Sequence, residues 1–450
     1  MSEAAFDLIV LGSGPSGGSI ATGAAEQGKR VAVVETRQVG GTCALRGCNP
    51  KKVYTNAGAI LDTARRSRGS LLGQADVAID WRSLHDFKRQ FTDPVPEGKR
   101  EDFANHGIEL IKGSSRFVDE QSIDVDGRVL KFERLVIATG AVPRPLDIPG
   151  EDLVTHSDDF LDLQDLPPCV TFIGGGYVSM EFAHVVARSG RRVVVAERGQ
   201  RVLDGFDPDL VRLLQDYSQR CGIEFRFNRE AKEVEGADGC VRQLVLDDGE
   251  RIDCQLVVHG AGRIPNLESL NLEAGNVKRC KRGVVVNKYL QSESNPRVFA
   301  TGDCAASDEP KLTPVANEEA RAVGNNLWSD QPDCAPQYGA VPSVAFTTPS
   351  IASVGLSAEQ AEQDHGDVDI RCEEISQWGS VRKVGGPVAG YKVILDKSNR
   401  RVLGAHLLGP GAEETINLFA LAMRYGLDAD QIKSTLFAFP TFASDVRQML

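Results

Sequence analysis

Two stretches of the chain repeat the same order of apolar and polar positions. Each begins with an apolar run, at 6–11 or 170–173, and continues through a glycine-rich turn into a segment with helical spacing. A second apolar run, at 30–35 or 192–197, closes each stretch on an acidic residue, and the same number of residues separates the first glycine from that acid. This order predicts strand, helix and parallel strand, so we expect two βαβ units.

The glycine-rich turns predict two dinucleotide sites. The candidate glycines are Gly12, Gly14 and Gly17 in the first turn and Gly174 and Gly176 in the second. Glycines let the backbone approach a pyrophosphate, whose charge meets the free N–H groups at the helix start. Glu35 and Glu197 would bind ribose hydroxyls, and Ser179 stands at the third glycine position of the second turn. The alternative, turns that serve only the fold, does not explain two matching copies.

Two further apolar runs break at a Thr-Gly pair. One ends at Thr139 and Gly140, and the other ends at Gly302 and Asp303. The Asp303 carboxylate could accept hydrogen bonds from a polyol, and its alternative is an ordinary turn at the end of a strand. Residues 329–338 have the composition of a linker, and alternating strand patterns with two helices follow them. The last third is therefore expected to be an α+β unit without a nucleotide motif.

Composition excludes several classes of protein. The 450 residues are 41% hydrophobic and 25% charged, and the net charge of −12 argues against a nucleic-acid binder or a protein held on anionic lipid. We expect no secretory signal, because the N-terminus has no basic region followed by a long apolar stretch. We expect no membrane span, because no apolar run reaches about 18 residues. Ten cysteines are too few for a disulfide scaffold. Eight lie singly, and we expect nearly all of them to be buried small apolar side chains in a reducing cytoplasm.

The remaining two cysteines, Cys43 and Cys48, follow directly on the first βαβ unit. Five residues of regular helix rise about 7.5 Å, more than the roughly 4.4–6.8 Å between the Cα atoms of a disulfide. A bond between them therefore needs an irregular turn, which Gly47 and Pro50 make possible. The basic neighbours, Arg46, Lys51 and Lys52, are expected to favour thiolates. A redox-active dithiol is favoured over two idle thiols.

The chain resembles the flavoprotein disulfide reductases, the family of glutathione reductase, lipoamide dehydrogenase and mercuric reductase, nearly from end to end. The resemblance rests on the order and spacing of GSGPSG, GGTCALRGCNPKK, ATGAVP, GGGYVSMEFA, HGAGRIPN, VFATGDC, LTPVANEEAR, FTTPSIASVGLS and VLGAHLLGPGAEE. It implies an α/β homodimer with two Rossmann-like domains and a C-terminal α+β dimerisation domain. The implied boundaries are 1–147 with 276–330 for FAD, 148–275 for NAD(P), and 338–450 for dimerisation.

The resemblance also assigns roles to residues. It implies that Cys48 faces the flavin, that Cys43 exchanges with substrate, and that Lys51 and Glu181 form an ion pair near the flavin N5. Tyr177 matches the aromatic lid that nicotinamide displaces. The implied FAD positions are Gly12, Gly14, Gly17, Glu35, Gly41, Thr42, Thr139, Gly140, Gly302 and Asp303. The implied nicotinamide dinucleotide positions are Gly174, Gly176, Glu197, Arg198 and Gly262, and no metal is expected.

The acid–base pair of the family is missing. Most members end with His-Pro-Thr-x-x-Glu, whereas this chain has Phe439 in place of the histidine and Ser444 in place of the glutamate. Phenylalanine neither donates nor accepts a proton. Asp445 stands one position after the place of the glutamate, from which it could act through a water. General acid–base catalysis contributes typically about 10²–10⁴-fold, so exchange with an ordinary disulfide should be slow unless the leaving thiol is acidic.

Nucleotide preference is expected to favour NADH. Glu197 favours a free ribose hydroxyl and repels a 2′-phosphate. Arg198 and Arg201 could bind that phosphate, but the family's second phosphate-binding arginine falls at Asp204.

Three functions are compatible with these residues. The first is NAD(P)H-dependent reduction of a small disulfide or related acceptor through the dithiol. The second is a diaphorase that reduces quinones without the cysteines, or other non-disulfide chemistry that follows from Phe439. The third is a binding protein that has lost turnover. The stretch 21–23 lacks the arginine with which many glutathione reductases bind a substrate carboxylate, which argues against glutathione as the acceptor. The C-terminus lacks the second thiol pair that is usual in mercuric reductases and large thioredoxin reductases.

Overall fold

The computed structural model describes residues 4–74 and 76–450, which form two compact units. The first unit contains the chain up to Lys51 together with Phe87–Arg144 and Arg263–Tyr338. The second contains Lys52–Asp86, Pro145–Gly262 and Gly339–Leu450. The chain therefore passes between the units several times, and each unit is described by itself.

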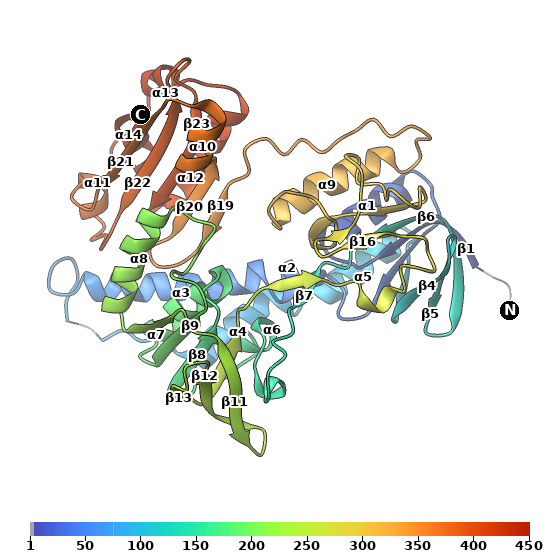
Figure 1. Ribbon diagram of the computed structural model, residues 1–450, viewed down its shortest axis with the longest axis horizontal. Coiled ribbons are helices and arrows are strands. Elements are labelled where there is room, and N and C mark those ends of the chain that lie inside the picture. Colours follow the sequence, from blue (N-terminus) through green and yellow to red (C-terminus); the bar gives the residue numbers. More distant parts are fainter. Residues whose placement is uncertain (1–3, 75) are drawn as a thin grey trace. The chain divides into compact units, whose positions relative to one another are not determined.

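The first unit is built on a sheet whose parallel strands run in the order β3, β2, β1, β6 and β18. These strands are β1 (Ala4–Leu11), β2 (Val31–Glu35), β3 (Glu109–Lys112), β6 (Arg128–Ile137) and β18 (Val298–Ala300). The strands β1 and β6 of this sheet are labelled in Figure 1. The antiparallel strands β5 (Ser122–Val125) and β4 (Ser115–Asp119) extend it beside β6. The strands β1 and β2 are largely apolar because both faces of the sheet are covered, one by helices and the other by apolar residues of 267–284.

Helices cover this sheet as the first βαβ unit predicts. The helix α1 (Pro15–Glu26) packs on β1 and β2 and lies beside α9 (Thr313–Asn326), while α5 (Val95–Asn105) packs on β3. The remaining elements of the unit are α2 (Gly41–Leu45), β7 (Ala141–Pro143), β15 (Arg263–Pro265), β16 (Arg279–Cys280), β17 (Gly283–Val284) and the short helices η2 (Glu268–Leu270) and η3 (Gly302–Cys304). Two helices connect the units in sequence, α3 (Cys48–Arg66) and α4 (Trp81–Thr92).

The second unit repeats the βαβ arrangement. Its parallel sheet has the order β10, β9, β8, β14, with bounds β8 (Cys169–Ile173), β9 (Arg192–Glu197), β10 (Ile223–Phe227) and β14 (Leu256–His259). The helices are α6 (Ser157–Phe160), α7 (Tyr177–Arg188), α8 (Pro208–Arg220) and the short η1 (Glu151–Leu153). An antiparallel sheet joins β11 (Ala231–Ala237), β12 (Cys240–Leu246) and β13 (Arg251–Asp253).

The last third of the chain forms an antiparallel sheet in the order β19, β20, β23, β22, β21. Its strands are β19 (Ser343–Ala345), β20 (Ile351–Gly355), β21 (Val368–Glu374), β22 (Gly390–Asp396) and β23 (Val402–Leu408). The helices are α10 (Ala358–His365), α11 (Gly379–Arg382), α12 (Ala412–Arg424), α13 (Ala429–Ser434) and α14 (Phe442–Met449), and α12 packs on β20 and β23. The predicted α/β class with a C-terminal α+β part is confirmed. No described helix combines the length and apolarity needed to cross a membrane.

A buried ion-pair cluster joins this last sheet to α8. The Lys392 ammonium lies 2.7 Å from carboxylate oxygens of both Asp207 and Asp209, and the side chains of Lys392 and Asp207 are buried. Asp207 also caps α8 by accepting the backbone N–H groups of Asp209 and Leu210. A buried carboxylate that loses its cation is strongly destabilising.

We therefore expect Lys392→Met to lower the free energy of unfolding by about 3–5 kcal/mol, measured by denaturant titration. The exposed pair between Lys397 and Asp367 provides the control, and Lys397→Met should cost at most about 1 kcal/mol. The hydrogen bond from Lys392 lowers the pKa of Asp209. The stability that this hydrogen bond contributes is fully present above the ordinary aspartate pKa of about 3.9 and is lost as pH falls through the lower pKa of the folded state. The cost of Lys392→Met should therefore shrink in acid. Equal costs for the two variants would contradict the role of burial.

Candidate functional site

The first glycine-rich turn is closed so tightly that side chains do not fit. Gly12 has φ +105°, and a Cβ atom there would lie 2.4 Å from the carbonyl oxygen of Ala138 at the end of β6. A Cβ atom on Gly17 would lie 2.2 Å from the oxygen of Gly12. One on Gly41 would lie 2.4 Å from the Cα atom of Gly14. Bare backbone thus lines the start of α1, as a pyrophosphate cradle requires.

The acid at the end of β2 closes the same turn. Glu35 Oε2 accepts hydrogen bonds from the backbone N–H of Ser13 at 3.0 Å and from its hydroxyl at 2.6 Å, and Oε1 accepts the N–H of Arg37. The helix α1 begins after Gly14 without a side-chain cap from any described residue. Its first N–H groups are therefore suited to an anion. This arrangement fits the dinucleotide predicted for these residues.

The second turn repeats this construction. Gly174 has φ +91°, and a Cβ atom there would lie 2.6 Å from the oxygen of Gly260. Glu197 Oε2 accepts the N–H of Gly175 at 2.5 Å, and Oε1 accepts the N–H of Gly199 at 2.6 Å. The helix α7 starts after Gly176, again uncapped by the side chains that the structure describes. A second dinucleotide fits here.

Ser179 imposes its own requirement on the second turn. Its side chain is buried, and a Cβ atom at position 260 would lie 1.7 Å from its Oγ. The serine therefore fits the third glycine position only because Gly260 has no side chain.

The other predicted cofactor positions lie around these turns. Thr42 is in α2, Arg198 is exposed after β9, and Gly262 precedes β15 with φ +101°. Thr139 Oγ1 donates to the oxygen of Asn266 at 2.8 Å, and Gly140 O accepts the N–H of Asn266.

A buried carboxylate that the sequence did not indicate holds the Gly302 turn. Glu319 of α9 accepts the N–H of Gly302 at 2.5 Å and the Tyr338 hydroxyl at 3.1 Å. Desolvation raises the pKa of Glu319 and that of Asp303, which lies in the same turn. Glu319 thereby fixes the loop that presents Asp303. The motif LTPVANEEAR contains Glu319, but its spacing does not indicate this contact, which depends on the fold.

The two clustered cysteines are brought together by a break between helices. Cys43 lies in α2 and Cys48 is the first residue of α3, with Arg46 and Gly47 between the helices. Thr313 Oγ1 donates to Cys43 Sγ at 3.2 Å and lies 3.7 Å from Cys48 Sγ. No disulfide joins these two cysteines. The irregular turn is confirmed, and the motif LTPVANEEAR, which contains Thr313, was the available signal for this contact.

Of the eight single cysteines only Cys169, Cys254 and Cys304 are buried, so the expected burial of nearly all eight is wrong.

The expected effect of the basic neighbours on Cys43 is wrong. Its pKa is raised well above that of an ordinary thiol, first because Cys48 shares a hydrogen bond with it and second because it is partly buried; the Thr313 hydroxyl opposes this. The Lys52 ammonium, expected to favour thiolates, instead pairs with Glu181. The hydrogen bond between the two thiols therefore disfavours the thiolate form of Cys43.

Glu181 of α7 is fully buried and accepts several donors. Its carboxylate lies 2.8 Å and 2.9 Å from Lys52 Nζ and accepts the N–H of Phe346 at 2.9 Å. The same ammonium lies 3.6 Å from the centre of the Phe346 ring. Lys51 is buried in the first unit, and its pairing with Glu181 stays a prediction. Tyr177 begins α7 and is 46% exposed, and its role as a displaceable lid stays a prediction.

The altered C-terminal motif carries no acid or base on its surface. Phe439 is 85% exposed. Ser444 forms a capping box with Thr441 at the start of α14. Asp445 is buried and accepts a hydrogen bond from the Ser380 hydroxyl, and desolvation raises its pKa. Asp445 is thus engaged with Ser380 inside the C-terminal part of the chain. Within the described residues, no group of His, Cys, Asp and Glu could hold a metal ion.

Two dinucleotide cradles and a paired dithiol define a class of flavin-linked oxidoreductases. Comparison with known families agrees: residues 6–320 match the pyridine nucleotide-disulphide oxidoreductase model, and residues 341–450 match its dimerisation domain. The chain belongs to this family. It is an oxidoreductase that uses FAD and a nicotinamide cofactor.

Relatives of several activities are similar to the chain over nearly its whole length. Glutathione reductase of Burkholderia cepacia is 32% identical, covering 98% of this chain and 97% of that protein. Mercuric reductase of Staphylococcus aureus is 30% identical, covering 98% and 81%. The flavoprotein disulfide reductase RclA of Escherichia coli, described as HOCl-induced, superposes with a TM-score of 0.86 at 24% identity, covering 98% and 99%. At that identity the superposition shows the shared fold.

The position of Asp445 leads to a prediction. Asp445→Asn keeps an acceptor for Ser380 but removes the ionisable group, so turnover with NADH and an acceptor should stay within about twofold of the wild type, far from the loss of 10²-fold or more expected for an acid–base residue. Steady-state kcat/KM across pH 5–9 measures this. Ser380→Ala, which removes the same hydrogen bond from the other side, is the control. A loss of pH dependence in Asp445→Asn alone would show that the carboxylate takes part.

Proposed function

We propose that the chain is a homodimeric, NADH-dependent FAD enzyme that reduces a small disulfide or a related acceptor through Cys43 and Cys48. The observation that carries this proposal is the pairing of both thiols on Thr313, next to a glycine cradle that fits FAD. Bound FAD would supply the two-electron chemistry between the nicotinamide and the dithiol. The residues that would hold it are those of the first turn, together with Glu35 and Asp303.

Exchange with the acceptor then follows from the two thiols. The Cys43 thiolate attacks one sulfur of the acceptor disulfide, which forms a mixed disulfide and releases one thiolate. Cys48 attacks the sulfur of Cys43, which releases the second thiolate and forms the Cys43–Cys48 disulfide. Each acceptor thus gains two electrons, and its thiolates take protons from water. The raised pKa of Cys43 makes the first attack the demanding step.

Phe439 selects among acceptors. A histidine at this position would protonate the leaving thiolate, and phenylalanine supplies no proton. Acceptors whose thiols are acidic, such as aromatic disulfides, need no such help. A second candidate, quinone reduction, is favoured by the same residue because it needs neither the missing proton donor nor the cysteines.

The proposed homodimer uses the C-terminal domain. Large apolar side chains stand exposed there: Leu421, Tyr425, Leu427, Leu436 and Phe439. They lie within the segment that matches the family's dimerisation domain. Burial of such a set against a second copy is what an obligate interface requires.

Cys43→Ser distinguishes the two acceptor classes. The variant should lose at least about 10³-fold in reduction of an aromatic disulfide, because the attacking thiol is gone and no second thiol remains to resolve a mixed disulfide on Cys48, while quinone reduction should stay near the wild-type rate. Anaerobic titration with NADH should still reduce the flavin. Cys240→Ser, an exposed cysteine elsewhere, is the matched control. Disulfide reduction that survives in Cys43→Ser would refute the dithiol route, and failure of NADH and NADPH to reduce the wild type would refute the proposal as a whole.

The preference for NADH rests on two carboxylates near the end of β9. Glu197 is held by the N–H groups of Gly175 and Gly199, where it would meet the ribose hydroxyls. Arg201 is engaged by Asp204, with 3.2 Å between its Nε and the carboxylate. A 2′-phosphate would therefore face negative charge and one already paired arginine, which leaves the exposed Arg198 to bind it.

Asp204→Arg should accordingly shift the ratio of kcat/KM for NADPH to that for NADH upwards by about tenfold or more, because it frees Arg201 and adds a cation. Steady-state kinetics with both nucleotides measures the ratio. Asp216→Arg makes the same change of charge on the exposed surface of α8 and should leave the ratio unchanged. A wild type that prefers NADPH would contradict the assignment.

A further inference from the structure

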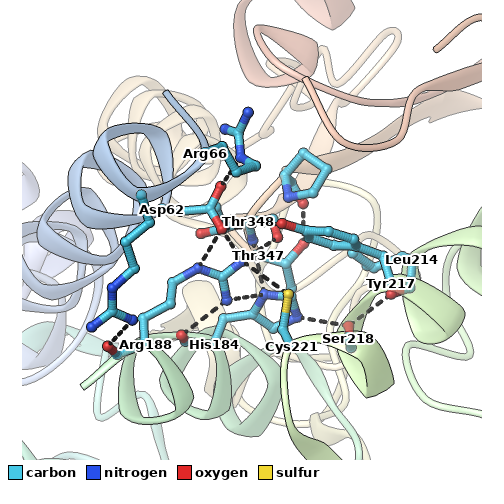
Figure 2. Close-up of polar contacts among 12 residues, drawn as sticks. Asp62, Arg66, His184, Arg188, Leu214, Tyr217, Ser218, Cys221, Thr347 and Thr348 are labelled. Carbon is cyan, nitrogen blue, oxygen red and sulfur yellow. Dashed lines mark hydrogen bonds and ion pairs between the residues drawn. The ribbon is translucent and has the colours of Figure 1, made fainter. Parts of the chain in front are cut away.

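We propose that His184 and Arg188 are positioning residues: they hold the backbone of residues 346–348 and thereby fix the carboxylate of Glu181. The inference rests on the proposed function and on the place near the flavin N5 that the family resemblance implies for Glu181. Glu181, His184 and Arg188 follow one another along one face of α7, and all three are buried. Figure 2 shows His184 and Arg188 with the polar side chains around them.

Each of the three side chains binds the backbone of the segment between β19 and β20. Glu181 accepts the N–H of Phe346 at 2.9 Å. His184 Nδ1 accepts the N–H of Thr348 at 3.1 Å, and Arg188 Nη2 donates to the oxygen of Thr348 at 3.0 Å. Three residues of α7 thus determine where this segment lies, and only the first of them is predicted to act near the flavin.

The protonation of His184 follows from its partners. The Ser218 hydroxyl donates to the oxygen of Leu214 at 2.7 Å, so it accepts from His184 Nε2 at 3.0 Å (Figure 2). The proton is therefore on Nε2, and Nδ1 is free to accept the Thr348 N–H. Burial, and then the charge of Arg188, hold the pKa of His184 well below its usual range. His184 is a neutral acceptor of fixed orientation.

Arg188 is in turn fixed by α3. Its Nε and Nη2 lie 3.0 Å and 2.8 Å from Asp62 Oδ1. Asp62 also accepts from Arg66 at 2.7 Å and from the Tyr217 hydroxyl at 3.1 Å (Figure 2). The guanidinium donates to Nδ1 and the carbonyl oxygen of His184 as well. A planar cation with several donors meets all these acceptors at once, which an ammonium group cannot do.

The same segment then acts on Glu181. Phe346 contributes both the N–H that Glu181 accepts and the ring that covers the Lys52 ammonium paired with it. If Thr348 loses its two ties to α7, Phe346 two residues earlier is no longer held, and the Glu181 carboxylate loses a directed donor. Geometry at a reacting centre that is loosened in this way slows the reaction without removing any reacting group.

Four variants separate positioning from stability. His184→Leu removes the acceptor for the Thr348 N–H, whereas His184→Gln keeps one. Arg188→Lys keeps the charge beside Asp62 but not the donor to Thr348. Tyr217→Phe removes a hydrogen bond to Asp62 from the same buried cluster and leaves residues 346–348 untouched, so it is the matched control for stability.

Two measurements on the full chain with FAD test the inference. Hydrogen–deuterium exchange at residues 344–350 should be about tenfold faster in His184→Leu and Arg188→Lys than in the wild type. The rate constant of flavin reduction by NADH in anaerobic stopped flow should fall by about tenfold to 100-fold in these two variants. His184→Gln and Tyr217→Phe should stay within about twofold in both measurements, even where their melting temperatures fall.

Every outcome decides the question. Equal reduction rates in His184→Leu and His184→Gln, or an equal slowing in Tyr217→Phe, would overturn the positioning role and leave the proposed function standing. If His184→Leu does not fold, the comparison of Arg188→Lys with Tyr217→Phe decides in the same way. A wild-type flavin that neither nicotinamide nucleotide reduces would overturn the proposed function and the positioning role with it.

Discussion

The missing Cβ atoms of two turns are the constraint on which the rest of the structure depends. At Gly12 and Gly174 the backbone passes so close to a neighbouring carbonyl oxygen that no side chain fits. Each turn then ends in an uncapped helix, and each is closed by a glutamate from the next strand. Tight backbone, free N–H groups and an acid at a fixed distance make a dinucleotide cradle, and two such cradles in one chain make electron transfer between two cofactors the natural use.

The proximity of the two thiols depends on a different feature, the break between the helices α2 and α3. Continuous helix through residues 41–66 would hold Cys43 and Cys48 too far apart, and the interruption at Arg46 and Gly47 turns both thiols towards one hydroxyl. That hydroxyl belongs to Thr313, which is far away in sequence but lies in the same unit. The redox centre is therefore a product of the folded first unit and not of the cysteine segment alone.

Sequence reasoning reached the parts of the molecule that local pattern determines. The βαβ repeats, their glycines and acids, and the need for an irregular turn between the cysteines all follow from periodicity and spacing, and the structure contains them. The buried polar groups did not follow. Glu319, His184 and Arg188 look like ordinary residues of amphipathic helices, and their partners lie on distant segments. The raised pKa of Cys43 escaped for the same reason, because neighbours in sequence do not predict which lysine turns to which carboxylate.

The residues proposed for flavin reduction therefore keep their polar partners, whereas those at the altered C-terminal motif do not supply a proton donor for the acceptor. Buried charge is tolerated only where every partner is in place, and around α7 the chain maintains such a network of Glu181, Lys52, Arg188 and Asp62. On the exposed C-terminal surface the opposite holds, since Phe439 carries no proton and Asp445 is turned inward to Ser380. A protein that had lost electron transfer altogether would have little reason to keep the first network at the cost of burying the three charges of Glu181, Arg188 and Asp62. The combination favours an enzyme in which the groups for flavin reduction are held in fixed positions. Its acceptor would release thiols acidic enough to leave without a proton from the protein.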